Sequence, residues 1–258
     1  TQGPSSKIVT CGGITASCLV LDIKNQQWNA GLMGDLPQRR LDHASVSMKN
    51  IGTLIGGLSY PSYLAPGTPK TTDFLAAGST EWVAGPAIPV TADRPCAVKI
   101  SQLSFLIINR KDIREYQVDT TDPTSSSGWQ EASKFPQLQT SRSNKFGCSK
   151  IGDQVVLAGG VGDSGFLRST EVLDLSTRTI VYAGDMNSPR AYFHMATITM
   201  NGEQTLFAFG GFSGSSALNS VEQFNTNNNT WTLAPTSMEE ARFEFGAVVL
   251  RRELVCPT

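Results

Sequence analysis

Several features that define common functional classes are missing from this 258-residue sequence. No uninterrupted apolar run approaches the roughly 18 residues that a membrane-spanning helix needs. Basic and acidic side chains number 21 and 22, which gives a formal net charge of −1 and no charge excess that would favour nucleic acid or an anionic membrane. With 40% hydrophobic and 17% charged residues, the composition is typical of an ordinary soluble protein with a substantial core.

Catalytic and metal-binding motifs are scarce as well. The sequence has only two histidines, His43 and His194, which make a poor metal site, so we interpret them as hydrogen-bonding residues. No nucleophile–base arrangement, phosphate-binding loop or paired-carboxylate motif stands out. The five cysteines match neither a zinc spacing nor a C-x-x-C redox motif. We therefore expect no enzymatic activity, no cofactor and no metal.

What the sequence does contain is a repeat with a period of about 50 residues. An apolar residue precedes an arginine by four positions in "LPQRR", "VTADR", "LQTSR", "MNSPR" and "MEEAR". These arginines are Arg40, Arg94, Arg142, Arg190 and Arg242, and they are 48 to 54 residues apart. Glycine pairs follow apolar runs at Gly12-Gly13, Gly56-Gly57, Gly159-Gly160 and Gly210-Gly211, with Asn109-Arg110 at the place of a fifth. Tryptophans recur at Trp28, Trp82, Trp129 and Trp231, with Ile180 at the remaining place.

Each period contains short β-type patterns. "HASVSM" and "HMATITM" alternate in part, "VVLAGG" is continuously apolar like a strand buried on both faces, and "TEVLDL" alternates again. The segment around each tryptophan completes a set of four strands, and no segment sustains an amphipathic helix. Four short strands in every period of about 50 residues predict the blades of a β-propeller.

The order of these markers resembles the kelch repeat. A glycine pair precedes "STEVLDLSTRTI" and "DMNSPR" in one period, and "SVEQFNTNNNTW" and "SMEEAR" in the next. The resemblance implies an all-β propeller of four-stranded antiparallel blades around a central channel. We expect one domain over residues 1–258, with repeats at about 7–42, 43–94, 95–142, 143–190 and 191–242. Residues 243–258 would add the closing strand to the first blade. Five blades are expected, and six are the alternative.

The cysteines bear on how the ends of the chain are joined. Cys11 and Cys18 flank the first expected hairpin, and Cys256 follows the last expected strand. A disulfide from Cys256 to Cys11 or Cys18 would stabilise the fold by restricting the unfolded chain; the alternative is three reduced thiols. Cys96 and Cys148 fall on innermost strands, where we expect buried free thiols.

The five arginines precede the first strand of each repeat, at the end of the blade where the loops after the glycine pairs also emerge. Their repetition predicts a ring of guanidiniums at the mouth of the channel, which could bind carboxylates, phosphates or an acidic peptide. Nearby aromatic residues could anchor a partner: Tyr60, Tyr63, Tyr192, Phe212 and Phe243. The alternative is structural, with the arginines satisfying buried carbonyls and the aromatics covering the blades. The glycines and tryptophans are interpreted as architecture, the tryptophans packing between blades.

The function predicted from these features is a non-catalytic binding module that engages a protein or acidic peptide through the arginine-bearing face. Nucleic acid and membrane insertion are not expected. One alternative is binding of a sugar, pigment or lipid in the channel or between blades, and another is structural cross-linking in matrix or cytoskeleton. Kelch-type copper oxidases need two histidine ligands and a cysteine-linked tyrosine, and specifier proteins need an acidic/histidine cluster. The sequence provides neither.

The cellular location is predicted from one glycosylation motif. The sequon Asn228-Asn229-Thr230 lies in an asparagine-rich turn, where Asn228 would be exposed. It favours an extracellular protein, with the cytoplasm as the alternative because sequons also occur by chance. The chain begins at Thr1 with no visible signal peptide, so we expect that a leader was removed or that the chain was trimmed.

Overall fold

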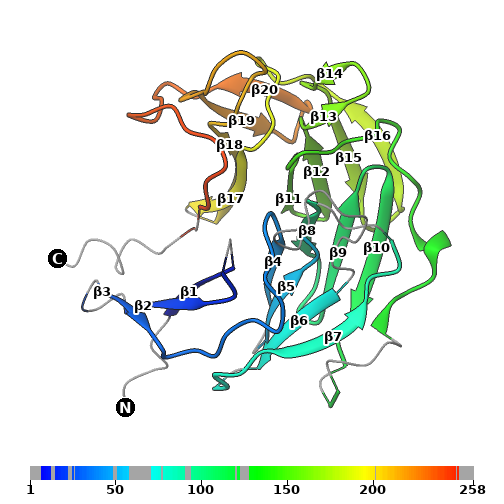
Figure 1. Cartoon of the computed structure of the whole chain (residues 1–258). Coiled ribbons are helices and arrows are strands. Elements are labelled where there is room, and N and C mark those ends of the chain that lie inside the picture. The colour runs from blue at the N-terminus through cyan, green and yellow to red at the C-terminus, as the bar shows by residue number, and fades with distance from the viewer. Residues whose placement is uncertain are drawn as a thin grey trace. The chain divides into compact units, whose positions relative to one another are not determined.

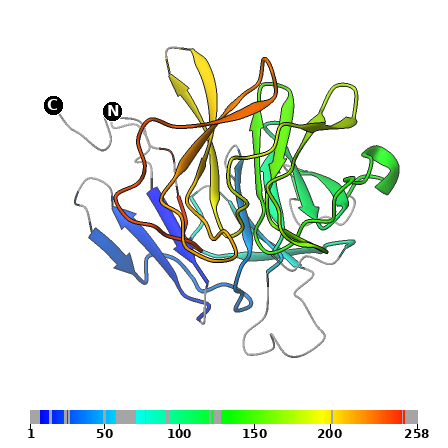
Figure 2. The same cartoon turned by 90° about the horizontal axis from the view of Figure 1, so that it is seen from above.

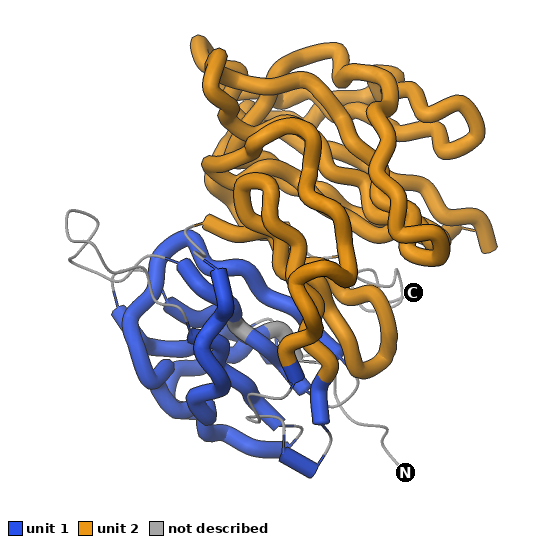
Figure 3. The backbone as a smooth tube through the Cα atoms, turned by 90° about the vertical axis from the view of Figure 1, so that its right-hand side faces the viewer, with its two compact units in different colours: residues 1–93, 118–128, 250–258 blue, residues 94–117, 129–249 orange. Residues whose placement is uncertain are grey.

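The computed structural model describes residues 7–12, 15–22, 25, 27–48, 51–57, 71–76, 78–90, 94–119, 121–122, 128–200, 202–247 and 249. They form five antiparallel sheets of three or four strands, joined in chain order, which are the blades of a five-bladed β-propeller, and one two-stranded ribbon. Contacts divide the chain into two compact units (Figure 3). Unit 1 comprises residues 1–93, 118–128 and 250–258, and unit 2 comprises residues 94–117 and 129–249.

Unit 1 contains blades one and two. Blade one has three described strands, β1 (Lys7–Cys11), β2 (Cys18–Asp22) and β3 (Gln27–Ala30), in the order β1-β2-β3. Blade two has four, β4 (Ala44–Met48), β5 (Ile51–Ile55), β6 (Thr71–Ala76) and β7 (Val83–Ala87), in the order β4-β5-β6-β7. Successive strands are neighbours, as hairpin connections between short alternating segments predict.

Unit 2 contains blades three, four and five (Figures 1 and 2). Blade three consists of β8 (Cys96–Lys99), β9 (Ser104–Asn109) and β10 (Asp112–Gln117). Blade four consists of β11 (Gly147–Ile151), β12 (Gln154–Ala158), β15 (Thr170–Asp174) and β16 (Thr179–Ala183). A small ribbon of β13 (Val161–Gly162) and β14 (Gly165–Phe166) extends from it. Blade five consists of β17 (His194–Met200), β18 (Glu203–Phe209), β19 (Val221–Asn225) and β20 (Thr230–Leu233).

Blade three departs from the four strands predicted for every repeat. At the place of its fourth strand, the described residues form a single bridge between Tyr116 and Trp129, followed by a 3-10 turn at Ala132–Lys134 (η2). Trp129 nevertheless packs where the repeat places it, with its ring 4.9 Å from that of Tyr116 and 6.3 Å from that of Phe105. Trp129 therefore keeps its aromatic contacts although the described residues around it form no fourth strand.

The core of unit 2 contains clusters of buried residues that each span two neighbouring blades. Val156 and Val172 of blade four form one cluster with Phe224 and Trp231 of blade five, and the Trp231 Nε1 donates a hydrogen bond to the Thr170 hydroxyl at 2.9 Å. This confirms the predicted packing of a tryptophan between blades. In blade one, by contrast, Trp28 is 51% exposed.

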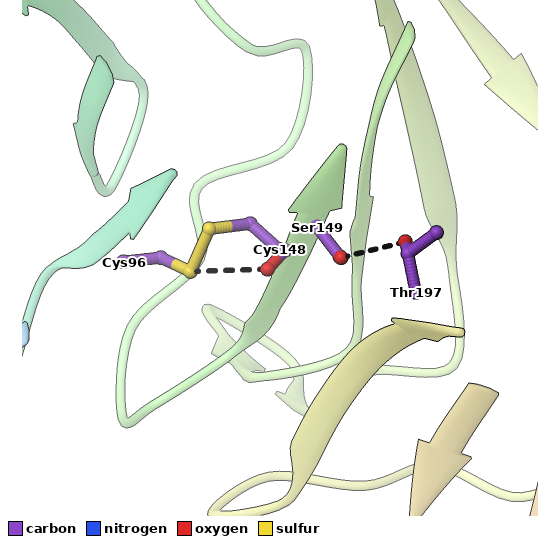
Figure 4. The surroundings of a disulfide bond; sticks show 4 residues. All are labelled: Cys96, Cys148, Ser149 and Thr197. Atoms are coloured by element: carbon purple, nitrogen blue, oxygen red, sulfur yellow. Dashed lines mark hydrogen bonds between the residues drawn. A yellow bond between two sulfur atoms is a disulfide. The ribbon is translucent and has the colours of Figure 1, made fainter. Parts of the chain in front are cut away.

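The cysteine pairing differs from the one predicted. Cys11 and Cys18 lie directly opposite each other across the β1–β2 hairpin and form a disulfide, so neither is available to Cys256, which lies outside the described residues. Cys96 and Cys148 are not free thiols, because they form a second disulfide between the first strands of blades three and four (Figure 4). Since β8 and β11 lie side by side, cysteines near the start of each come within bonding distance, with a Cα–Cα separation of 6.1 Å.

The closing strand remains a prediction. Residues 243–247 and Val249 are described and form no strand, while residues 248 and 250–258 lie outside the described part of the chain. No helix among the described residues has the length and apolar character needed to cross a membrane.

Candidate functional site

Three of the five repeated arginines are buried, and each makes the same set of hydrogen bonds within a different blade. Arg40, Arg142 and Arg190 have exposed fractions of 0%. Each Nη1 donates to the carbonyl of the first glycine of a pair and to the carbonyl of a Ser or Thr at the start of the third strand. The glycines are Gly56, Gly159 and Gly210, and the hydroxyl residues are Thr71, Ser169 and Ser220. Each Nη2 donates to that hydroxyl and to a carboxylate two residues further on: Asp73, Glu171 or Glu222.

The carboxylates also hold the chain segment that leads to each arginine. The Glu171 carboxylate accepts from the backbone N–H groups of Gln139 and Thr140, at 2.7 and 3.1 Å. Glu222 accepts in the same way from Asn187 and Ser188, at 2.7 and 3.2 Å. These donors lie three and two residues before the arginine. In blade two the corresponding residue is Pro37, which has no N–H, and the shorter Asp73 replaces the glutamate.

Burial dominates the electrostatics of these clusters. It lowers the pKa of Arg40, Arg142 and Arg190, and the facing carboxylate opposes that shift in each case. The pKa of Asp73 is raised by burial, which the contact with Arg40 opposes. A buried charge is stable only when it is paired and hydrogen-bonded, as it is here. The structural alternative, in which the arginine satisfies buried carbonyls, therefore describes these three residues.

The backbone carbonyl of the repeated arginine accepts a hydrogen bond from the blade that precedes it in the chain. Gly160, at the end of β12 in blade four, donates its N–H to the carbonyl of Arg190 at 2.8 Å, and Gly211 donates to the carbonyl of Arg242 at 2.9 Å. Gly160 has a φ of +89°, and a Cβ there would lie 2.8 Å from the carbonyl oxygen of Ser143. Only glycine fits this approach, which explains why the glycine pairs and the arginines repeat together.

Arg94 does not occupy the same position as the buried arginines. It lies two residues before β8, whereas Arg40 and Arg190 lie four residues before β4 and β17. Its φ of +52° matches that of the residues two positions after the other arginines, such as Tyr192 at +55°. Its Nη1 donates to the Asn144 side chain at 3.0 Å. Blade three lacks the glycine pair after its second strand, and the start of its third strand has Lys111 and Ile113 where a buried arginine would need a Ser or Thr and a carboxylate.

Arg242 has the backbone of a buried arginine but an exposed side chain. Its N–H donates to the carbonyl of Leu218 at 3.1 Å, as that of Arg190 does to Leu167 at 3.1 Å. The Arg242 side chain is 51% exposed and contacts Glu240, itself 79% exposed, at 3.1 Å. Arg242 therefore has an exposed side chain, whereas Arg94 is half-buried and the other three arginines are fully buried.

Three phenylalanines lie in a row beside Arg242, and we call them the aromatic row. The Phe212 ring lies 5.7 Å from that of Phe166 and 5.4 Å from that of Phe243. They come from the β13–β14 ribbon of blade four, the loop after β18 of blade five and the segment after blade five. Phe243 is 46% exposed. The sequence pointed to Phe212 and Phe243 but not to Phe166, because no other repeat forms the ribbon that positions it within the described residues.

Tyr192 belongs to the same end of blade five, and backbone contacts connect it to its neighbours. Its N–H donates to the carbonyl of Lys145 at 3.1 Å, and its own carbonyl accepts from Glu244 at 2.9 Å. The segments before β11, before β17 and after β20 are thus joined in succession. Tyr60 and Tyr63, the other two aromatic candidates, lie outside the described residues.

Side chains that could bind a metal ion are dispersed in the described part of the chain. There, no three His, Cys, Asp or Glu side chains gather closely enough to hold a metal ion. His194 is the first residue of β17, and burial lowers the pKa of its imidazole. What the site offers is a partly exposed apolar surface, with Phe166 and Phe212 half-buried and Phe243 exposed, next to charged side chains, an arrangement suited to binding.

Comparison with known proteins identifies the repeat. A family model described as the Kelch motif matches residues 201–238, which span β18 to β20 of blade five. The kelch repeat-containing protein kel-10 of Caenorhabditis elegans is 26% identical over 133 residues, which cover 51% of this chain and 23% of that protein. The chain thus spans about a quarter of the length of the curated relative that it matches. The chain thus contains a kelch motif in blade five, is similar to a kelch-repeat protein over about half of its length, and has the fold of a five-bladed β-propeller.

Proposed function

We propose that this propeller is a protein-binding module that engages its partner through the aromatic row and the charged residues beside it. Kelch-repeat propellers are commonly protein-interaction modules and are generally non-catalytic scaffolds. The observation that carries the proposal is the row itself. The Phe212 ring lies 5.7 Å from that of Phe166 and 5.4 Å from that of Phe243, the three come from separate segments of the chain, and Phe243 is 46% exposed. Exposed aromatic clusters next to arginine are typical of the residues that dominate binding energy at interfaces.

The rigidity of the backbone around the row supports binding without a large ordering cost. The carbonyl of Arg242 is fixed by Gly211, and the N–H of Glu244 is fixed by Tyr192, so Phe243 lies between two anchored residues. Ser213 accepts hydrogen bonds from the N–H groups of Ser215 and Ser216, which orders the loop after Phe212. A surface that is ordered before binding loses less conformational entropy when the partner arrives.

The charges beside the row favour a basic rather than an acidic partner segment. Residues 239–244 contain three glutamates and one arginine, and Glu240 already neutralises Arg242. An acidic peptide was expected to bind five accessible arginines, but three of them are buried, Arg94 is half-buried and only Arg242 has a side chain shown to be more than half exposed. We therefore infer a partner segment that carries an apolar anchor with basic side chains next to it.

The test compares two exposed apolar residues at opposite ends of blade five. Phe243 lies in the row, whereas Met200 is 55% exposed at the β17–β18 turn, at the other end of the blade. Partners captured from native extract by the tagged full chain would be quantified by mass spectrometry for the wild type, Phe243→Ser and Met200→Ser. We expect Phe243→Ser to reduce capture of a specific protein at least about tenfold and Met200→Ser to leave it unchanged.

Two results would contradict this proposal. Equal capture by Phe243→Ser and the wild type would show that the aromatic row is not part of the interface. A salt-sensitive loss with Arg242→Ala and none with Phe243→Ser would favour the acidic partner instead. A small molecule found bound to the purified chain, unaffected by either change, would support the alternative of ligand binding within the propeller.

We also propose that the module works outside the cytosol. Its two disulfides support this location, because such bonds persist in oxidising compartments and are rare where glutathione keeps thiols reduced. Thiol labelling of the native protein before and after reduction tests the proposal. Reactive Cys96 and Cys148 in the untreated protein would contradict it.

A further inference from the structure

We propose that Asn228 is a site of N-linked glycosylation, and that its glycan leaves the aromatic row uncovered. The sequence contains one sequon, Asn228-Asn229-Thr230, at the β19–β20 hairpin turn of blade five. Asn228 and Thr230 are both exposed. The proposal concerns a modification, and its evidence is independent of which partner the row binds.

The turn presents the two sequon side chains together. Thr230 Oγ1 donates a hydrogen bond to Asn228 Oδ1 at 2.7 Å. Among the described residues, no hydrogen bond uses the Nδ2 of Asn228, which is the atom that receives the sugar. The reactive amide is therefore available without breaking any contact of the folded turn.

The turn keeps its conformation by other contacts. The Asn229 carbonyl accepts from the N–H of Gly184 in blade four at 2.7 Å, and the N–H of Asn227 donates to Asn225 Oδ1 at 2.9 Å. Asn229 itself has a φ of +56°, a conformation that asparagine tolerates better than most residues. A glycan on Asn228 would thus project from a turn that does not depend on that side chain for its shape.

The disulfides are the second, independent observation. Cys11–Cys18 and Cys96–Cys148 need the oxidising environment in which N-glycosylation of eukaryotic proteins takes place. The co-reactant is a lipid-linked oligosaccharyl diphosphate. Asn228 Nδ2 forms a bond to the anomeric carbon of the sugar, the bond from that carbon to the diphosphate oxygen breaks, and Nδ2 loses one proton.

The strand order places the glycan at the end of blade five opposite to the row. In the order β17-β18-β19-β20, the β17–β18 and β19–β20 turns lie at one end of the sheet. The loop from β18 to β19, which carries Phe212, and the segment before β17 lie at the other end. The modification would therefore cover the turn end of the blade and leave the proposed interface accessible.

The experiment measures the mass of the peptide that contains Asn228. The native protein, and the full chain exported from eukaryotic cells behind a cleavable leader, would be digested before and after treatment with an N-glycosidase. We expect a glycan mass that the enzyme removes, with conversion of Asn228 to aspartate. An unmodified Asn228 in either preparation would overturn the proposal.

Matched variants in the same turn separate the sequon from the local structure. Asn228→Gln and Thr230→Ala should abolish the added mass, whereas Thr230→Ser, which keeps the sequon, and Asn227→Gln, which lies beside it, should retain it. A mass that persists in Asn228→Gln would place the glycan elsewhere and refute the assignment. Because the readout is mass, a failure here leaves the binding proposal unaffected. If both proposals hold, enzymatic removal of the glycan should leave partner capture unchanged.

Discussion

Blades three and five both pack against blade four within unit 2, and they are held to it by different means. Blade five shares a core with blade four. The Thr197 hydroxyl of blade five also accepts a hydrogen bond from the Ser149 hydroxyl of blade four and donates one to the carbonyl of Lys150 at 2.7 Å. Blade three also shares a core with blade four, but its first strand is covalently bonded to β11 by the Cys96–Cys148 disulfide. Figure 4 shows both contacts on either side of β11.

The difference follows from how completely each blade has the repeated features. Blade five has four strands, a glycine pair and the buried Arg190 cluster. Among its described residues, blade three has three strands, a two-residue turn at Arg110–Lys111 in place of the glycine pair, and no Ser/Thr-x-carboxylate motif at the start of its third strand. A regular blade is thus positioned by hydrogen bonds that its repeat supplies, and the irregular blade is the one with a covalent bond to its neighbour.

The largest effect is expected from breaking the buried cluster of blade five. Glu222→Ala leaves Arg190 charged and buried with no carboxylate, so we expect the free energy of unfolding to fall by about 3–5 kcal/mol. The matched control is Arg242→Ala, which removes an exposed arginine of the same repeat position and should change stability by less than about 0.5 kcal/mol. Guanidinium titrations followed by tryptophan fluorescence measure both. Similar losses in the two variants would mean that burial does not distinguish the two arginines.

The next effect comes from the covalent bond of blade three. Replacing Cys96 and Cys148 by serine together should lower the free energy of unfolding by about 2–4 kcal/mol, because the bond closes a long loop in the unfolded chain. The Cys11–Cys18 bond joins residues only 7 apart, against 52 for Cys96–Cys148, so the same double replacement there should cost less. Equal or reversed losses in the two double variants would argue against this reading of the two bonds.

The smallest effect is the pH dependence of stability. It should be specific to blade five, because His194 begins β17 of that blade. Burial lowers the pKa of His194 below its ordinary 6.5, so the unfolded chain takes up the proton at a higher pH than the folded chain. Stability should therefore fall as the pH drops below about 6.5, and His194→Gln should lessen that fall. Amide exchange should show the change in β17 and not in β8. If the stability of the wild type and of His194→Gln depended on pH in the same way, this prediction would be wrong.

The repeat made the fold predictable because its markers are requirements of the backbone. Gly160 and Gly211 recur because their N–H groups must approach the carbonyl of the next arginine, and this spacing is visible in the sequence. The same sequence also contains the partner of each buried arginine. Ser169-x-Glu171 and Ser220-x-Glu222 recur with the arginines, and that pairing was the signal that Arg142 and Arg190 turn inward.

Other features could not be read from local pattern. Blade one has Ser17 in the position of Ser169 but Leu19 in the position of Glu171, so its motif is incomplete although its hairpin is present. Phe166 depends on the β13–β14 ribbon, which among the described residues forms in blade four alone. The Cys96–Cys148 bond depends on how closely two blades approach, although the separation of 52 residues, about one repeat, was a clue that the two cysteines occupy corresponding strands.

That disulfide also divides the chain mechanically. Residues 97–147, which include all of β9 and β10, lie inside the covalent loop. A force applied to the two ends of the chain passes through the sulfur atoms and does not extend that segment. At about 3.3–3.6 Å per residue, reduction would release on the order of 170–190 Å of additional length. Blade three therefore carries tension only when the bond is open, and the force at which the chain yields reports its oxidation state.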